Sequence, residues 1–183
     1  MKKVFILNGV GASGKGTFVD YLNKYIPILY YSIATLPKEA ATILGWNGGK
    51  TEKDRKFLSD IVDISTKYND APFKDVVSLV TDFRNSKDYS EYDAMIVDMR
   101  DPKDIARAVK AFGAETILLR NPNVTKIESN HADRDVENYN YDYIIENDGT
   151  LKQLEKMAML FSMQVIVNNC FAKPTLFKCS ILE

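Results

Sequence analysis

The chain has 183 residues, of which 45% are hydrophobic and 27% are charged. This balance is typical of a globular domain and argues against a disordered or fibrous protein. The net charge of -1 argues against a dedicated DNA-binding protein and makes polymeric nucleic acid an unlikely partner. We therefore expect a single domain over residues 1–183.

The sequence has no segment with the features of a membrane span or a secretion signal. Its apolar runs are far shorter than the roughly 18 residues that cross a bilayer. The run that follows residues 1–3 is also too brief for a signal peptide. The two cysteines, Cys170 and Cys179, are too few for a disulfide framework. We predict a cytoplasmic protein with reduced thiols and no membrane partner.

Short apolar clusters bounded by turn residues predict β-strands. None of them alternates strictly with polar residues, which is typical of a parallel sheet with helices on both faces. The five clusters are Val4 to Leu7, Ile28 to Ile33, Ala94 to Val97, Thr116 to Leu119 and Tyr143 to Ile145.

Helix-start signals lie between these clusters, at Thr51, Pro72, Asp101 and Thr150. Strands that alternate with helices predict an α/β fold, a three-layer domain with a five-stranded, mostly parallel sheet. The interval 34–92 is too long for a simple crossover. We interpret it as a helical insertion over one end of the sheet, where it would bind the acceptor of a reaction.

The tail 169–183 gives no clear pattern. Either an edge strand or a contact with a partner would explain its scattered apolar residues.

A glycine-rich segment follows the first predicted strand and precedes a predicted helix. Glycines let successive backbone N–H groups point into one anion-binding nest, and the helix adds its N-terminal partial positive charge. The lysine of such a loop reaches the β- and γ-phosphates of ATP, and a hydroxyl can bind phosphate or Mg²⁺. The residues expected to bind ATP and Mg²⁺ are Gly9, Gly11, Ala12, Ser13, Gly14, Lys15, Gly16 and Thr17.

The end of this loop departs from the general phosphate-loop motif, in which Ser or Thr follows the lysine directly. The order Gly14, Lys15, Gly16, Thr17 resembles adenylate kinases and related nucleoside monophosphate kinases. The stretches 120–122, 131–132 and 142–151 resemble the C-terminal part of deoxynucleoside monophosphate kinases. The resemblance implies a P-loop kinase fold, and it is weak over the insertion, where such families vary to select their acceptor.

Charged residues at the predicted strand ends complete the expected site. Asp98 ends the third strand, where a carboxylate can hold Mg²⁺ or its waters. The resemblance implies that Arg100 binds the acceptor phosphate. It also implies a short lid over 121–135, with Arg120 and Arg134 supplying positive charge to the transferring phosphoryl group.

Other residues have a functional and a structural interpretation. The resemblance places Asn147 near the adenine base, whereas helix capping alone also explains its turn. Arg55 and Arg84 in the insertion either bind an acceptor or line a solvated helix face. Trp46 either stacks on a base or packs a turn. His131 is the only histidine, so a relay of histidines is excluded.

These features predict direct transfer of the ATP γ-phosphoryl group to a small phosphorylated acceptor, foremost a nucleoside or deoxynucleoside monophosphate. A different phosphorylated metabolite or a modified nucleobase remains an alternative acceptor. A regulatory protein that binds nucleotides without turnover is a second alternative. A GTPase is disfavoured because the sequence lacks an Asn-Lys-x-Asp motif. The oligomeric state stays open.

Overall fold

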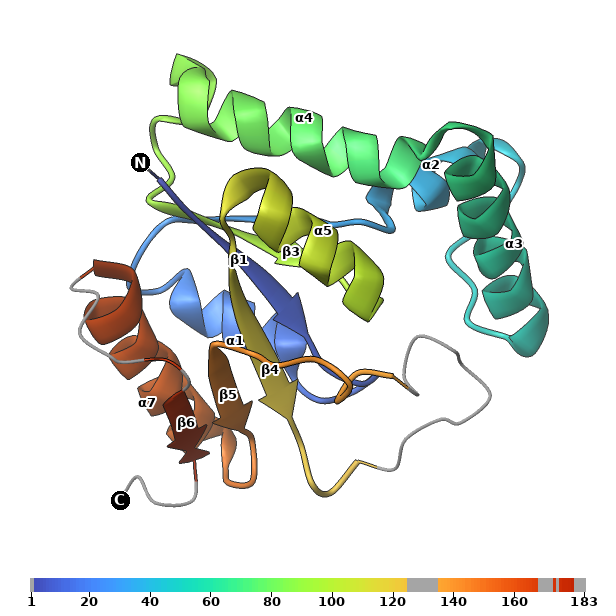
Figure 1. Ribbon diagram of the computed structural model, residues 1–183. Coiled ribbons are helices and arrows are strands. Elements are labelled where there is room, and N and C mark those ends of the chain that lie inside the picture. The colour runs from blue at the N-terminus through green and yellow to red at the C-terminus, as the bar shows by residue number, and fades with distance from the viewer. Residues whose placement is uncertain (1, 125–134, 168–172, 174, 180–183) are drawn as a thin grey trace.

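The computed structural model describes residues 2–124, 135–167, 173 and 175–179 (Figure 1). Within these residues, six strands form one sheet in the order β2-β3-β1-β4-β5-β6, and every neighbouring pair is parallel. The strands are β1 (Lys3–Asn8), β2 (Ile28–Ser32), β3 (Ala94–Asp98), β4 (Glu115–Arg120), β5 (Tyr143–Glu146) and β6 (Thr175–Lys178).

Helices cover both faces of the sheet. They are α1 (Lys15–Leu22), α2 (Thr35–Ile43), α3 (Glu52–Asn69), α4 (Ala71–Asn85), α5 (Pro102–Phe112) and α7 (Leu151–Phe161), with the short helices η1 (Lys87–Tyr89) and η2 (Ser162–Val167). Phe5 and Leu7 of β1 pack into the core beneath α1 and α7. Their neighbours Val4 and Ile6 pack into the core beneath α4 and α5, because successive side chains of a strand point to opposite faces.

The predicted three-layer P-loop fold is therefore confirmed, and all five predicted strands are present. The predicted number of strands is wrong, because the described residues contain a sixth strand, β6, at the edge beside β5. Its four residues bury Phe177 but expose Leu176, so the segment lacks the apolar run that marks the other strands.

The predicted helix starts agree with the structure. Thr51 caps α3, since its side chain accepts from the Asp54 N–H at 3.2 Å and the Asp54 carboxylate accepts from the Thr51 N–H at 2.9 Å. Asp101 caps α5, and Thr150 forms the same reciprocal pattern at the start of α7. Pro72 lies in the first turn of α4. Local sequence signals thus set these boundaries.

The insertion 34–92 is helical, as predicted, and holds α2, α3 and α4. Helix α4 packs on the sheet through buried apolar side chains, whereas α3 buries no side chain fully and lies beside α2 and α4, away from the sheet (Figure 1). Its binding role stays a prediction. No helix in the described residues combines the length and apolar character needed to cross a membrane.

Candidate functional site

The glycine-rich loop connects the end of β1 to the start of α1. Ala12 and Gly14 adopt left-handed conformations, with φ of 62° and 103°, and these turn the backbone back toward the helix. Gly14 is the N-cap of α1, and no side chain caps the helix there. The first N–H groups of α1 are therefore directed at the space in front of the loop, as an anion site requires.

Gly9 and Gly16 of this loop differ in the space that a side chain would meet. A Cβ at Gly9 would lie 2.4 Å from the Leu119 carbonyl oxygen, so a side chain at this position would clash with the backbone of β4. A Cβ at Gly16 would meet nothing within 4 Å. Packing within the described chain does not require Gly16 to be glycine, and the space in front of it is open to a ligand.

Lys15 is the first residue of α1 and is only 8% exposed. Its Nζ donates to the Gly9 carbonyl at 2.5 Å and to the Val10 carbonyl at 3.3 Å. These contacts hold the ammonium group within the curve of the loop. The lysine is thus placed beside the backbone that would surround a phosphate.

An open pocket of about 370 Å³ lies at the carboxyl ends of the strands, in front of the loop. The pocket brings together most of the residues predicted from the sequence, and it includes Tyr30 of β2, which sequence reasoning missed. Its lining consists of Gly11, Ala12, Ser13, Gly14, Lys15, Gly16, Thr17, Tyr30, Asp98 and Arg100. Ligands of open α/β sheets bind at this edge.

Asp98 faces the pocket from the end of β3, level with Leu7 at the end of β1. Its Oδ2 accepts a hydrogen bond from the Tyr30 hydroxyl at 3.2 Å. Its Oδ1 is buried and has no hydrogen-bond partner among the described residues. Burial, reinforced by the charge of Asp98, raises the pKa of Tyr30 well above its ordinary value, so the hydroxyl remains a donor. A buried oxygen of this kind calls for a polar or cationic partner.

The donor set fits Mg²⁺. The ion usually takes one or two carboxylates and completes its shell with phosphate and water oxygens. Asp98 supplies the carboxylate, and Thr17 supplies a hydroxyl on the same pocket. No group of three acidic, histidine or cysteine side chains that could hold a metal ion is found among the described residues.

Arg120 is predicted to contact the transferring phosphate, but in this structure it does not line the pocket. Its Nη1 pairs with Glu146 at 3.3 Å and its Nη2 with Glu137 at 3.1 Å. The buried Nε has no hydrogen-bond partner among the described residues. Arg134 and most of the predicted lid, 121–135, lie outside the described residues.

Asn147 contacts the phosphate loop directly. Its Nδ2 donates to the Ser13 carbonyl at 3.0 Å, and a Cβ at Gly14 would come within 2.7 Å of that nitrogen. The backbone N–H of Asn147 donates to the Arg120 carbonyl at 2.7 Å. The residue therefore braces the loop against the end of β4. The contact with the adenine base that the resemblance implies stays a prediction.

The insertion residues with two interpretations make contacts within the protein. Arg84 donates to the Phe112 carbonyl at 2.8 Å and so satisfies the C-terminal end of α5. The Trp46 ring N–H donates to the Gly49 carbonyl at 3.2 Å and pins its own turn. Arg55 is exposed and donates to the Lys50 carbonyl at 3.3 Å. These contacts support the structural interpretations of Arg84 and Trp46.

No family model and no curated protein matches the sequence. Solved structures with a similar arrangement include a sugar kinase from Janibacter sp. HTCC2649, at 11% identity and a TM-score of 0.49, over 92% of this chain and 98% of that chain. A de novo designed protein with the P-loop NTPase fold has 14% sequence identity and a TM-score of 0.40, and the similarity covers 90% of this chain and 94% of that chain. An LAO/AO transport system kinase has 13% sequence identity and a TM-score of 0.35, and the similarity covers 97% of this chain and 52% of that chain. Likenesses this distant do not tell what this chain binds.

Proposed function

We propose that the chain is an ATP-dependent kinase that transfers the γ-phosphoryl group directly to a small phosphorylated acceptor. The observation that carries this proposal is the joint pocket, in which the phosphate loop and Lys15 face Asp98 and Arg100. One side of the pocket has the groups that bind the phosphates of a nucleotide, and the other side offers a carboxylate and a guanidinium. Binding of ATP with Mg²⁺ already accounts for the carboxylate, so the guanidinium of Arg100 is the group that favours a second, phosphorylated substrate.

Each of these groups has a distinct part in the transfer. The loop N–H groups and Lys15 hold the donor phosphates and follow the charge of the group in transit. Arg100 presents a planar fork of donors that suits an acceptor phosphate. Asp98 and Thr17 would hold Mg²⁺, which would supply positive charge to the phosphates.

The acceptor that we propose is a nucleoside or deoxynucleoside monophosphate. The motif around Lys15, the turn at Asn147 and the helical insertion, which begins after the carboxyl end of β2, support this choice. Arg120 and Arg134 remain the proposed additional cations. Arg120 would first have to break its ion pairs with Glu137 and Glu146.

The test is ATP consumption by the purified protein with a panel of ribo- and deoxynucleoside monophosphates, together with direct ATP binding. Transfer to one acceptor, lost in Lys15→Ala, supports the proposal and identifies the substrate. If ATP binds and no monophosphate accepts, the acceptor is a different metabolite or a nucleobase, or the protein has a regulatory role. If ATP does not bind, the proposal is wrong.

A further inference from the structure

A fully buried asparagine connects three segments around the pocket. Asn8 is the last residue of β1 and precedes the phosphate loop. Its Oδ1 accepts from the Gly9 N–H at 2.7 Å, and its Nδ2 donates to the Arg100 carbonyl at 3.1 Å. The same nitrogen donates to the Tyr141 hydroxyl at 2.7 Å. One side chain thus joins the loop, the Arg100 turn and the segment that leads into β5.

The chemistry of the partners determines the orientation of the Asn8 amide. A backbone N–H can only donate and a carbonyl can only accept, so a single orientation satisfies both Gly9 and Arg100. The Tyr141 hydroxyl donates to the Val136 carbonyl at 2.6 Å and is therefore free to accept from Asn8. Both amide hydrogens of Asn8 are used, and the hydrogen bonds form a directed network.

The network acts where Arg100 leaves the sheet. Arg100 lies two residues beyond the end of β3, and the Met99 N–H donates to the Leu7 carbonyl of β1 at 3.2 Å. Asn8 supplies a second attachment of the same turn to the end of β1. Because Asn8 is shielded from water, breaking this attachment leaves buried polar groups unpaired, which is unfavourable.

We propose that Asn8 is a positioning residue, which holds the Arg100 turn at a set distance from the phosphate loop so that Arg100 faces the pocket. The inference rests on the proposed function, in which Arg100 binds the acceptor. Asn8 itself does not line the pocket, so it acts through Arg100 and Gly9 and not by touching a substrate.

The kinetic test uses Asn8→Ser, whose hydroxyl is too short to reach the Arg100 carbonyl. We expect the KM for the acceptor to rise by about tenfold or more, with the KM for ATP changed by less than about threefold. In an Arg100→Ala background, the same substitution should add less than about twofold, because residues that act as a unit are not additive. Equal effects on both KM values, or additive losses, would overturn the inference.

Tyr141→Phe provides a milder variant that keeps the ring and its packing. We expect a rise of about threefold in the acceptor KM, with the ATP KM unchanged. Tyr139→Phe is the matched control: its ring packs against Tyr141 at a centroid distance of 5.2 Å, but Asn8 does not bond to it. Equal effects of Tyr141→Phe and Tyr139→Phe on the acceptor KM would also overturn the inference. If Asn8→Ser does not fold, this pair of variants is the test.

Hydrogen exchange separates this inference from the proposed function. In Asn8→Ser, or in Tyr141→Phe if that variant is used, exchange at the amides of Met99 and Arg100 should accelerate, while exchange at Ile96 within β3 stays slow. Unchanged exchange at Met99 and Arg100 overturns the positioning role, whatever the enzyme does. If the wild-type protein transfers phosphate to no acceptor but the exchange effect is present, the kinase proposal fails and Asn8 still positions the Arg100 turn.

Discussion

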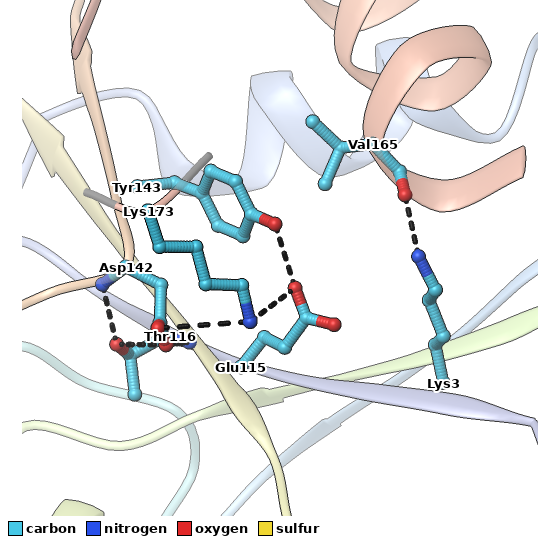
Figure 2. Close-up of polar contacts among 7 residues, drawn as sticks. All are labelled: Lys3, Glu115, Thr116, Asp142, Tyr143, Val165 and Lys173. Atoms are coloured by element: carbon cyan, nitrogen blue, oxygen red, sulfur yellow. Dashed lines mark hydrogen bonds and ion pairs between the residues drawn. The ribbon is translucent and has the colours of Figure 1, made fainter. Parts of the chain in front are cut away.

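The pocket at the carboxyl end of the sheet and the polar cluster of β4, β5 and Lys173 at its amino end treat their polar groups in opposite ways. At the carboxyl end, the Ser13 hydroxyl and one oxygen of Asp98 are buried without a hydrogen-bond partner among the described residues. At the amino end, charged and polar side chains of β4, β5 and the C-terminal segment bond to one another (Figure 2). Polar groups left to a ligand indicate a binding site, whereas groups that satisfy each other indicate a structural element.

The cluster at the amino end shows how completely such groups can be paired. The Tyr143 hydroxyl donates to Glu115 at 2.7 Å, and Lys173 lies 2.9 Å from the same carboxylate. The Asp142 carboxylate accepts from the backbone and the hydroxyl of Thr116 at 2.8 and 2.9 Å. In Figure 2 these side chains point toward one another from β4, β5 and the segment before β6. We interpret this cluster as the attachment of the C-terminal strand.

The largest expected difference between the two ends is in catalysis. We expect Lys15→Ala to lower the transfer rate by about 10³-fold or more, because the lysine stabilises charge on the transferring group. Lys173→Ala, the matched lysine at the amino end, should leave the rate within about twofold of the wild type. Both rates are measured as ATP consumption. A comparable loss of transfer rate in the two variants would contradict a catalytic role for the carboxyl end and a structural role for the amino end.

A second expected difference separates ligand binding from stability within the loop. Gly16→Ala should raise the free energy of unfolding by about 0.5–1 kcal/mol, since alanine is the better helix residue and its Cβ meets open space. The same methyl group should weaken ATP binding by about tenfold or more, because it occupies the approach to the phosphates. Titration with ATP and denaturant unfolding measure the two quantities. Unaltered ATP affinity would place the phosphates away from Gly16.

The third prediction concerns stability at the amino end. Tyr143→Phe removes the donor to Glu115 and should lower the free energy of unfolding by about 1–2 kcal/mol. The KM for ATP and for the acceptor should stay unchanged, in contrast to Tyr141→Phe at the carboxyl end. Denaturant unfolding and steady-state kinetics give both readouts. A change in either KM would show that the amino end influences the site.

The smallest expected effect is on stability at alkaline pH. Burial raises the pKa of Tyr141 to about 12 from an ordinary value of 10.0. The unfolded chain therefore loses this proton near pH 10 while the folded protein keeps it, so stability should fall as the pH rises from about 10 to 12. Tyr141→Phe should make this fall shallower than in the wild type, as measured by unfolding at several pH values. An unchanged slope would mean that Tyr141 ionises as easily in the folded protein.

Local patterns account for much of the fold. The five short apolar clusters became strands: β1, β3 and β4 are largely buried between the helical layers, whereas β2, at the sheet edge, buries only Ile28. Thr51, Asp101 and Thr150 mark helix starts by short-range hydrogen bonds. An edge strand was one of two interpretations of the tail, and β6 was not counted in the predicted sheet because an edge strand needs few apolar residues. Its place depends on pairing with β5, which lies about thirty residues earlier in the chain.

The site was only partly predictable. The loop from Gly9 to Thr17 is recognisable because its chemistry depends on neighbouring residues. Tyr30 carries no motif and reaches the pocket only because β2 pairs with β3, which places it near Asp98. Asn8 offered one usable signal, a polar residue that ends an apolar strand directly before the loop.

The sequence by itself determined the phosphate loop, the alternation of strands and helices, and the residues that start the helices, because these depend on contacts a few positions apart. Tertiary structure alone decided which distant side chains meet. It pairs Arg120 with Glu137 and Glu146, and it leaves Asp98 facing the pocket with one buried oxygen unpaired. The order of the strands determines which of these side chains come into contact. That order depends on the burial of the whole sheet and not on any short segment.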